Sequence, residues 1–381
     1  MTILNDAPYW IALAHLPEWR TEKINKLIID ILINKNKTFT DFFSSNEDGW
    51  KSEFLLNEKE ISDLIKARSD LPALSFLAES LYNQGFEIIP INSPEYSPTL
   101  KNNLKTKLSP PLLYLKGNKQ LLHEPSVAIV GSRNAGEKSL VFTENLAREF
   151  AKNYKVVVSG FAKGVDKMAL DASIKYNGHS IIVLPQGILS SSREFQKYYP
   201  QIIAGDVLVV STFPPKVPWS VGLAMARNAY IYGLAEEIYV AEADSKGGTW
   251  SGAIDGLKKG RKVYVRLPES DENIANELLI QKGAIPIDFS GKPIVQDKLS
   301  EVQIAEHHKI SPPDMENRIK EILKFYVLTA KEIKEVLNLD WDTRKLSDYL
   351  KTTDFIVMEK TKKGLKFRLK DYNSQENTLF K

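Results

Sequence analysis

A buried strand that ends in a glycine and an arginine is the strongest chemical signal in this sequence. Gly131, Ser132 and Arg133 directly follow the apolar run 127–130. Continuous apolar runs are typical of parallel strands buried on both faces, and ligands of such sheets bind beyond the carboxyl ends of the strands. Gly131 permits close approach of a ligand to the backbone, Ser132 can cap the turn or donate to phosphate, and Arg133 can form paired bonds to phosphate oxygens. The alternative is a surface ion pair for Arg133.

This glycine turn belongs to neither of the two common phosphate-binding motifs. Gly131 and Gly136 lack the middle glycine of G-x-G-x-x-G, so the dinucleotide fingerprint is absent. No Gly-Lys-Ser/Thr sequence follows a glycine-rich stretch either, which excludes the Walker P-loop.

A second glycine-rich turn follows the apolar run 156–158. A helix is expected to begin near its last glycine, and the free N–H groups of a helix start attract anions. Lys163 adds a positive charge. Asp166 in the first helical turn is interpreted as a partner of the helix dipole, and the alternative is that it fixes the turn or repels misplaced anions. The predicted anion-binding residues of this turn are Ser159, Gly160, Phe161, Ala162, Lys163 and Gly164.

Two later segments complete the predicted site. Arg227 and Asn228 lie within one of them. Gly247, Gly248 and Thr249 open a helix, where backbone donors and hydroxyls suit phosphate or ribose. The next residue, a tryptophan, can either stack on a base or pack in the helix–sheet core.

Alternating apolar strands and amphipathic helices predict the fold class, an α/β protein with an extended Rossmann-like, doubly wound parallel sheet. The predicted strands are 87–91, 112–115, 126–130, 155–159, 180–185, 206–210, 237–241, 262–266 and 284–287, and the predicted helices between them include 137–153, 165–176, 221–233 and 249–260. Four regions follow from these patterns: a helical domain over 1–85, the Rossmann-like core over 86–290, a linker over 291–313 and a winged-helix domain over 314–381.

The helical region contains a short predicted helix over 58–68 with Asn57 as its N-cap. The winged-helix prediction rests on helices at 315–325, 330–337 and 344–352, followed by a hairpin over 356–370. Thr329 and Glu332 predict a capping box, and Asp342 or Thr343 caps the third helix. The wing is basic, which suits a secondary contact with DNA phosphates as well as protection of an edge strand. Its predicted contact residues are Lys360, Lys362, Lys363 and Lys366.

Composition narrows the function classes. The 381 residues carry 51 Lys and Arg against 48 Asp and Glu, which excludes a uniformly basic coat but not local basic patches. There is no cysteine and there are five histidines, so we expect neither a metal site nor a bound cofactor. No apolar run reaches the 18 residues of a membrane span, and the first residues do not resemble a signal peptide. We therefore expect a cytoplasmic protein without membrane association.

Taken in order, these motifs resemble the DNA-processing protein A (DprA/Smf) family. The resemblance rests on Val130-Gly131-Ser132-Arg133, on the segment 159–166, on Arg227-Asn228, on Pro110–Asn118, and on Leu279-Ile280 with Gly283-Ala284. It also includes Trp10–Leu13, which is similar to the opening of that family's small helical (SAM-like) domain.

The resemblance implies a protein that binds and protects single-stranded DNA and loads a RecA-type recombinase onto it, often during natural transformation. It implies a homodimer, no enzymatic activity, and Arg133 and Lys163 in the DNA-binding pocket. Two alternatives stay open: a nucleotide-sensing module of the same superfamily, and a nucleotide phosphoribohydrolase. The hydrolase is disfavoured because Trp250, Ser251 and Gly252 follow the glycine turn where that branch places a glutamate.

The sequence departs from the family pattern at Thr212, Ala229 and Glu269, and its Tyr199-Pro200 pair is displaced. These departures are expected to lie along one side of the groove.

Overall fold

The computed structural model describes residues 2–190, 195–244, 247–269, 272, 275–294, 312–323, 327–337, 339, 341–361 and 364–370. Contacts divide the chain into two compact units, residues 1–293 and 294–381. The predicted helical region and the predicted core therefore pack together within one unit. Most of the predicted linker 291–313 lies outside the described residues.

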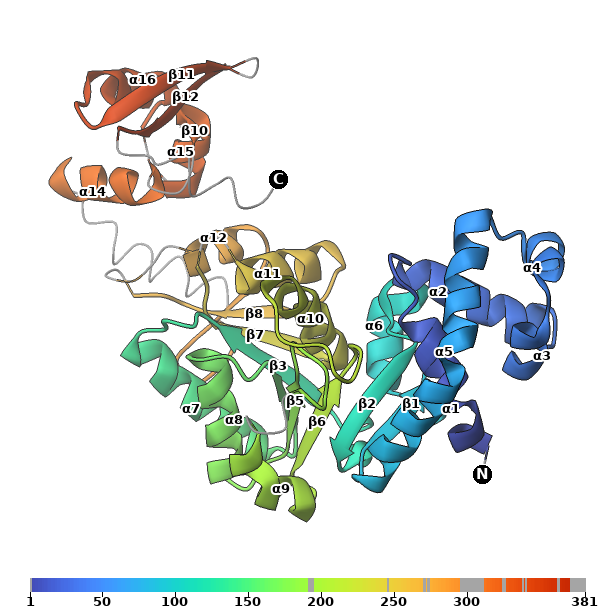
Figure 1. Cartoon of the computed structure of the whole chain (residues 1–381). Helices are drawn as coiled ribbons and strands as arrows, with labels where there is room; N and C mark the ends of the chain where they lie inside the picture. Colours follow the sequence, from blue (N-terminus) through green and yellow to red (C-terminus); the bar gives the residue numbers. More distant parts are fainter. Residues whose placement is uncertain are drawn as a thin grey trace. The chain divides into compact units, whose positions relative to one another are not determined.

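Among the described residues, the first unit contains nine strands and most of the helices, and Figure 1 shows their arrangement. Its strands are β1 (Glu87–Pro90), β2 (Leu112–Gly117), β3 (Ser126–Gly131), β4 (Val156–Ser159), β5 (Ser180–Val183), β6 (Val207–Ser211), β7 (Glu237–Glu242), β8 (Val263–Arg266) and β9 (Ile285–Ile287). Its helices are α1 (Thr2–Ala14), α2 (Thr21–Ile29), α3 (Phe39–Ser44), α4 (Glu47–Phe54), α5 (Glu58–Asn83), α6 (Pro98–Leu108), α7 (Glu137–Lys152), α8 (Val165–Lys175), α9 (Tyr199–Ala204), α10 (Val221–Leu234), α11 (Gly248–Lys258) and α12 (Ala275–Gln281).

All nine predicted strands form, and they join one sheet in the order β1-β2-β6-β5-β4-β3-β7-β8-β9. The strands from β6 to β9 are parallel, as predicted. The prediction of a wholly parallel sheet is wrong at one edge, where β1, β2 and β6 pair antiparallel. The apolar pattern of a buried strand carries no information on its direction, and antiparallel strands are common at the edge of parallel sheets.

Helices cover both faces of the sheet, because alternate residues of each strand point to opposite sides. On one face α7 and α8 pack on Val127, Ile129 and Val157. On the other face α6, α10 and α11 pack on residues of the same strands, such as Ala128 and Val130. The carboxyl ends of β3, β4 and β7 lie between these two helical layers, in neighbouring positions of the sheet.

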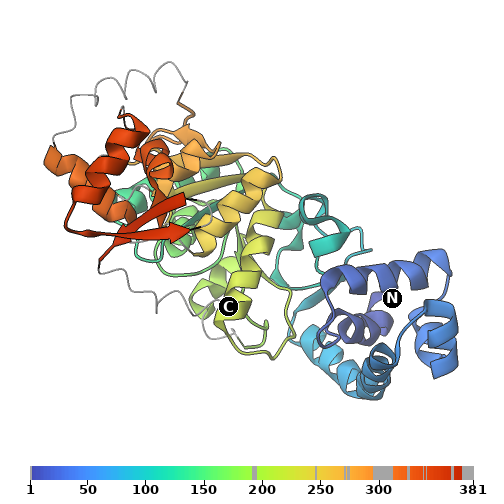
Figure 2. The same cartoon turned by 90° about the horizontal axis from the view of Figure 1, so that it is seen from above.

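The helices of residues 2–83 gather beside β1 and β2, at one edge of the sheet (Figure 1). Figure 2 shows the same blue helices grouped around the N-terminus. His15 joins them to the sheet through a hydrogen bond between its Nε2 and the hydroxyl of Tyr114, at 2.9 Å. Asn57 and Glu60 form a capping box at the start of α5, so the predicted cap is confirmed. The helix itself runs to Asn83 rather than to residue 68. Pro72 lies inside it, and prolines are usually a sign that a helix ends.

The second unit contains α14 (Pro312–Leu323), α15 (Ala330–Leu337) and α16 (Thr343–Thr352), with the strands β10 (Leu328–Thr329), β11 (Ile356–Thr361) and β12 (Gly364–Leu369). The strands form an antiparallel sheet in the order β10-β12-β11. The predicted caps are confirmed: Glu332 N donates to Thr329 Oγ1 at 3.3 Å, and Asp342 accepts from Arg344 N. Helices and hairpin thus follow in the predicted order, and the winged-helix domain stays a prediction.

Candidate functional site

The predicted site residues come together because β3 lies between β4 and β7 in the sheet. The segments 131–133, 159–164 and 247–249 follow these three strands, so the parallel arrangement brings their loops to one edge. Arg133 and Lys163 are both exposed there. Each projects from a loop whose backbone is held in place by its neighbours.

The loop that carries Arg133 is fixed by its own polar atoms and by β7. Ser132 N donates to Glu242 O at 2.8 Å, and Ser132 Oγ accepts from Asn134 N at 3.1 Å. Only 4% of Ser132 is exposed. Its hydroxyl therefore caps the turn, one of the two roles that the sequence allowed, and Arg133 is the residue of this motif that faces solvent.

Gly164 brings the second loop against the first. Its φ is +78°, a conformation that favours glycine. A Cβ at this position would lie 2.3 Å from Ser132 O and 2.8 Å from Arg133 C. Val165 N, at the start of α8, donates to Ser132 O at 3.3 Å. The loops of Arg133 and Lys163 therefore touch through their backbones, which holds the two cations in one neighbourhood.

A buried carboxylate and a buried guanidinium lie beneath the second loop. Gly160 N donates to Asp166 Oδ2 at 3.1 Å, and Arg227 Nη1 donates to Val183 O at 3.1 Å. Arg227 is only 3% exposed and Asp166 is 7% exposed. Burial raises the pKa of Asp166, while the guanidinium of Arg227 and the N–H groups of Ala162 and Gly160 act in the opposite direction.

These bonds change the predicted roles of several residues. Asp166 accepts a hydrogen bond from Gly160 N in the loop, which agrees with the alternative that it fixes the turn and adds to its role at the helix dipole. Arg227 was predicted as a DNA ligand, but its guanidinium is enclosed beside Asp166, which suits a positioning residue. The N–H groups of Gly160 and Val165, which were expected to be free for phosphate, are bonded within the protein.

The predicted segment 247–249 borders the site on the other side of β3. Thr249 Oγ1 donates to Gly131 O at 3.1 Å, which ties the start of α11 to the end of β3. A Cβ on Gly248 would lie 2.2 Å from Asn228 Nδ2, so Asn228 borders this helix start. Trp250 packs against the core of this face, in agreement with the core interpretation of that residue.

The departures from the family pattern do not lie on one side, and this expectation is wrong. Thr212 follows β6 and Glu269 follows β8, which lie on opposite sides of β3 in the sheet order. Position along the chain is a poor guide here because the strand order is not the sequence order. Of the predicted wing residues, Lys366 donates to Val327 O at 3.4 Å. Lys362 and Lys363 lie outside the described residues, and so does the side chain of Lys360.

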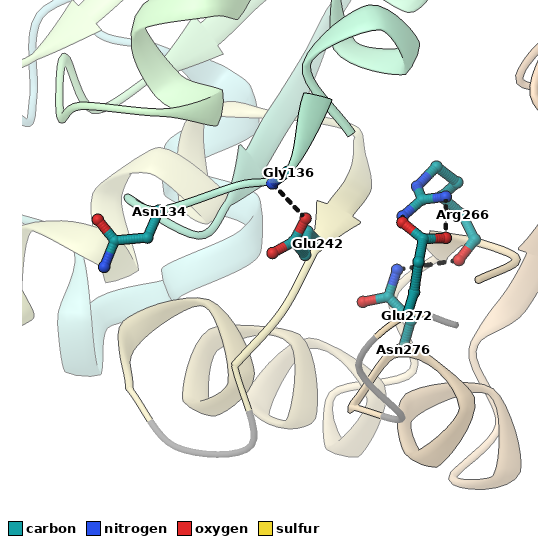
Figure 3. Close-up of a pocket in the computed structure, with 6 residues that line it drawn as sticks. All are labelled: Asn134, Gly136, Glu242, Arg266, Glu272 and Asn276. Carbon is teal, nitrogen blue, oxygen red and sulfur yellow. Dashed lines mark hydrogen bonds and ion pairs between the residues drawn. The ribbon is translucent and has the colours of Figure 1, made fainter. Parts of the chain in front are cut away.

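A pocket of about 270 Å³ that the sequence analysis missed adjoins the loop of Arg133. It is lined by Asn134, Gly136, Glu242, Arg266, Glu272 and Asn276 (Figure 3). Arg266 ends the predicted strand 262–266, so a charged residue at the carboxyl end of a buried strand was the available signal. Within the described part of the chain, no cluster of three His, Asp or Glu side chains could hold a metal ion, and no helix is long and apolar enough to cross a bilayer.

The fold and this edge define a Rossmann-like α/β protein with two exposed cations beyond the carboxyl ends of its central strands. The chain belongs to the family of DNA recombination-mediator protein A, whose model matches residues 87–297.

Individual relatives agree with this assignment. The DNA processing protein DprA of Bacillus subtilis strain 168 is 31% identical over 237 residues, 59% of this chain and 76% of that protein. Protein Smf of Escherichia coli K12 is 33% identical over 206 residues, which is 52% of this chain and 53% of that protein. The X-ray structure of DNA processing protein A from Streptococcus pneumoniae is similar over 77% of this chain and 96% of that chain, with a TM-score of 0.53 and 26% identity.

Proposed function

We propose that this protein takes part in DNA processing by binding single-stranded DNA at the carboxyl edge of β3, β4 and β7. The observation that carries the proposal is the backbone contact between Gly164 and the loop of Ser132 and Arg133, which places the exposed Arg133 and Lys163 close together. Two cations held side by side on rigid loops suit successive phosphates of a flexible strand. The rigid phosphate spacing of a duplex fits them less well.

Membership in a recombination-mediator family supports a role in supplying the bound strand to a RecA-type recombinase. On the same basis we propose a homodimer that acts in the cytoplasm. An enzymatic role is not part of the proposal, because Trp250, Ser251 and Gly252 follow the glycine turn. No carboxylate stands there to assist hydrolysis at a ribose.

The second unit offers a secondary contact for DNA. Arg344 and Lys345 are exposed on α16, and the predicted wing supplies Lys360, Lys362, Lys363 and Lys366. Charge reversal at Lys362 and Lys363 is expected to weaken DNA binding by less than the changes at Arg133 and Lys163. An unchanged affinity of that double variant would argue for a protein-binding role of this unit.

The test is fluorescence polarisation of a labelled 20-mer of dT, titrated with the protein at several salt concentrations. Arg133→Glu/Lys163→Glu is expected to bind about a hundredfold more weakly, since two charge-assisted contacts of about 1.5 kcal/mol each are lost. The slope of log affinity against log salt is expected to fall by about 1.4, at about 0.7 per phosphate of a single strand.

The matched control is Lys258→Glu/Lys282→Glu, which makes the same change in net charge. Lys258 ends α11 and precedes β8, and Lys282 follows α12 and precedes β9, so both lie near the amino ends of their strands, away from the carboxyl edge. Both are exposed. The proposal fails if the two double variants bind equally well, or if the unmodified protein does not bind the strand at low salt.

A further inference from the structure

The pocket beside the loop of Arg133 lies at the carboxyl ends of β3, β7 and β8. Its volume of about 270 Å³ is far above the roughly 10–15 Å³ that one water molecule needs. It is close to the lower limit of pockets for small organic ligands, about 300 Å³. This space suits a single heterocycle rather than a large cofactor.

One wall of the pocket is rigid and has its polar groups satisfied (Figure 3). Arg266, which is 1% exposed, donates from Nη1 and Nη2 to the carboxylate of Glu272 at 2.8 and 2.6 Å. Its Nε donates to Ala241 O, at 3.0 Å. Asn276 accepts from Ala243 N at 2.9 Å and donates to Arg266 O at 2.9 Å. This wall shapes the pocket, and its arginine is neutralised by Glu272.

The opposite wall presents polar atoms that are available to a ligand. Glu242 Oε2 accepts from Gly136 N at 3.0 Å. Within the described part of the chain, the second carboxylate oxygen of Glu242 and the side-chain amide of Asn134 have no hydrogen-bond partner. Because Arg266 and Glu272 cancel, Glu242 sets the charge of the pocket, and it disfavours phosphate there. A fitting ligand donates hydrogen bonds to the carboxylate.

Among the parts of a nucleic acid, the bases with exocyclic amino groups meet this demand. Carboxylates accept from cytosine N4, whereas thymine presents only an acceptor at the corresponding position. Asn134 can then donate to an acceptor on the same base edge. The loop 132–136 joins the DNA site to the pocket, because Asn134, which lines the pocket, directly follows Arg133.

We propose that this pocket takes an amino-bearing base of the bound strand, such as cytosine, and that Glu242 and Asn134 read its edge. The inference rests on the proposed binding of single-stranded DNA and adds base preference to it. Arg133 holds the phosphate, and the neighbouring pocket admits cytosine over thymine.

The experiment compares the affinities of 20-mers of dC and dT at pH 7.5, by polarisation, for the unmodified protein, Glu242→Gln and the control Glu236→Gln. Glu236 is exposed at the opposite end of β7. We expect the unmodified protein and Glu236→Gln to prefer dC at least fivefold, a ratio that corresponds to about 1 kcal/mol. In Glu242→Gln the amide oxygen can still accept from Gly136 N, and its NH₂ then donates to thymine O4. The preference should therefore vanish or reverse.

A purely structural role of Glu242 would weaken both strands equally and leave the preference in place, which would overturn the proposal. Equal affinities of the unmodified protein for dC and dT would overturn it as well, with strand binding itself intact. Absence of binding to either strand would instead refute the proposed function, and the inference with it.

Two further measurements, on a second variant and with a free nucleotide, complete the test. Asn134→Ala changes an exposed side chain and is expected to reduce the dC preference, so the test stands even if Glu242→Gln does not fold. Free dCMP is expected to displace the dC strand only at millimolar concentration. Displacement at micromolar dCMP would overturn the strand assignment and identify a site for free nucleotides.

Discussion

The guanidinium of Arg227 lies directly against the backbone of Gly160. A Cβ at position 160 would fall 1.5 Å from Arg227 Nη1 and 2.6 Å from Asp166 Oδ2. The glycine therefore makes room for the guanidinium of Arg227 and the carboxylate of Asp166, which lie beneath the loop of Lys163. In this way the loop is shaped by residues that do not themselves face solvent.

Gly160→Ala is expected to lower the free energy of unfolding by about 3 kcal/mol, because overpacking displaces Arg227 from a buried site. Urea unfolding measures the change. Gly222→Ala is the control, since a Cβ there meets only Ser220 Oγ at 4.0 Å and alanine favours the helix. An equal effect of both substitutions would refute the packing explanation.

Arg227→Met is expected to cost about 3–5 kcal/mol of unfolding free energy, because it leaves the buried carboxylate of Asp166 without its cation. Arg227→Met/Asp166→Asn should be more stable than the single variant, since the uncompensated charge is gone. Chemical unfolding of the two single variants and the double variant gives the coupling energy. A value near zero would show that the two side chains act independently.

Gly164→Ala should lower the affinity for single-stranded DNA about tenfold, an estimate that corresponds to a loss of about 1.4 kcal/mol. The new methyl group would lie against Ser132 O and push apart the loops of Arg133 and Lys163. Gly283→Ala serves as the matched control: its φ is +101°, but no atom lies within 4 Å of its Cβ position. If both variants lose DNA affinity to the same extent, loop separation is not the cause.

His15 predicts a pH dependence of stability. Burial lowers its pKa from 6.5 to about 4 in the folded protein. Between these two pKa values the unfolded chain binds a proton at His15 that the folded protein does not bind. The contribution of His15 to the free energy of unfolding is therefore fully present above pH 6.5 and is lost as the pH falls toward 4. A shift of this size corresponds to about 3 kcal/mol.

The measurement for His15 is the unfolding free energy of the unmodified protein and of His15→Gln between pH 4 and pH 7.5. As the pH falls, the unfolding free energy of the unmodified protein should decrease relative to that of His15→Gln, since glutamine does not titrate. A difference that is independent of pH would contradict the prediction.

The periodicity of apolar residues predicted the strands and helices of the core well, because buried strands and amphipathic helices have distinct local patterns. It could not predict the direction of β2, since strand direction leaves no mark on a fully apolar run. The helix predicted over 58–68 extends to Asn83 as α5. Tertiary contacts bury residues on both sides of Pro72, such as Leu64 and Ala78, and local spacing does not reveal such contacts.

The sequence by itself determined that glycine turns with Arg133 and Lys163 follow buried strands, and this is a local property of the chain. Only the tertiary structure decided which polar groups remain free. In the folded protein Arg227 is buried near Asp166, and the Ser132 hydroxyl accepts a hydrogen bond within its turn. Asn134 and Glu242 line the same pocket. Such outcomes depend on strand order and on competition for hydrogen bonds between distant segments, and neither is written in local spacing.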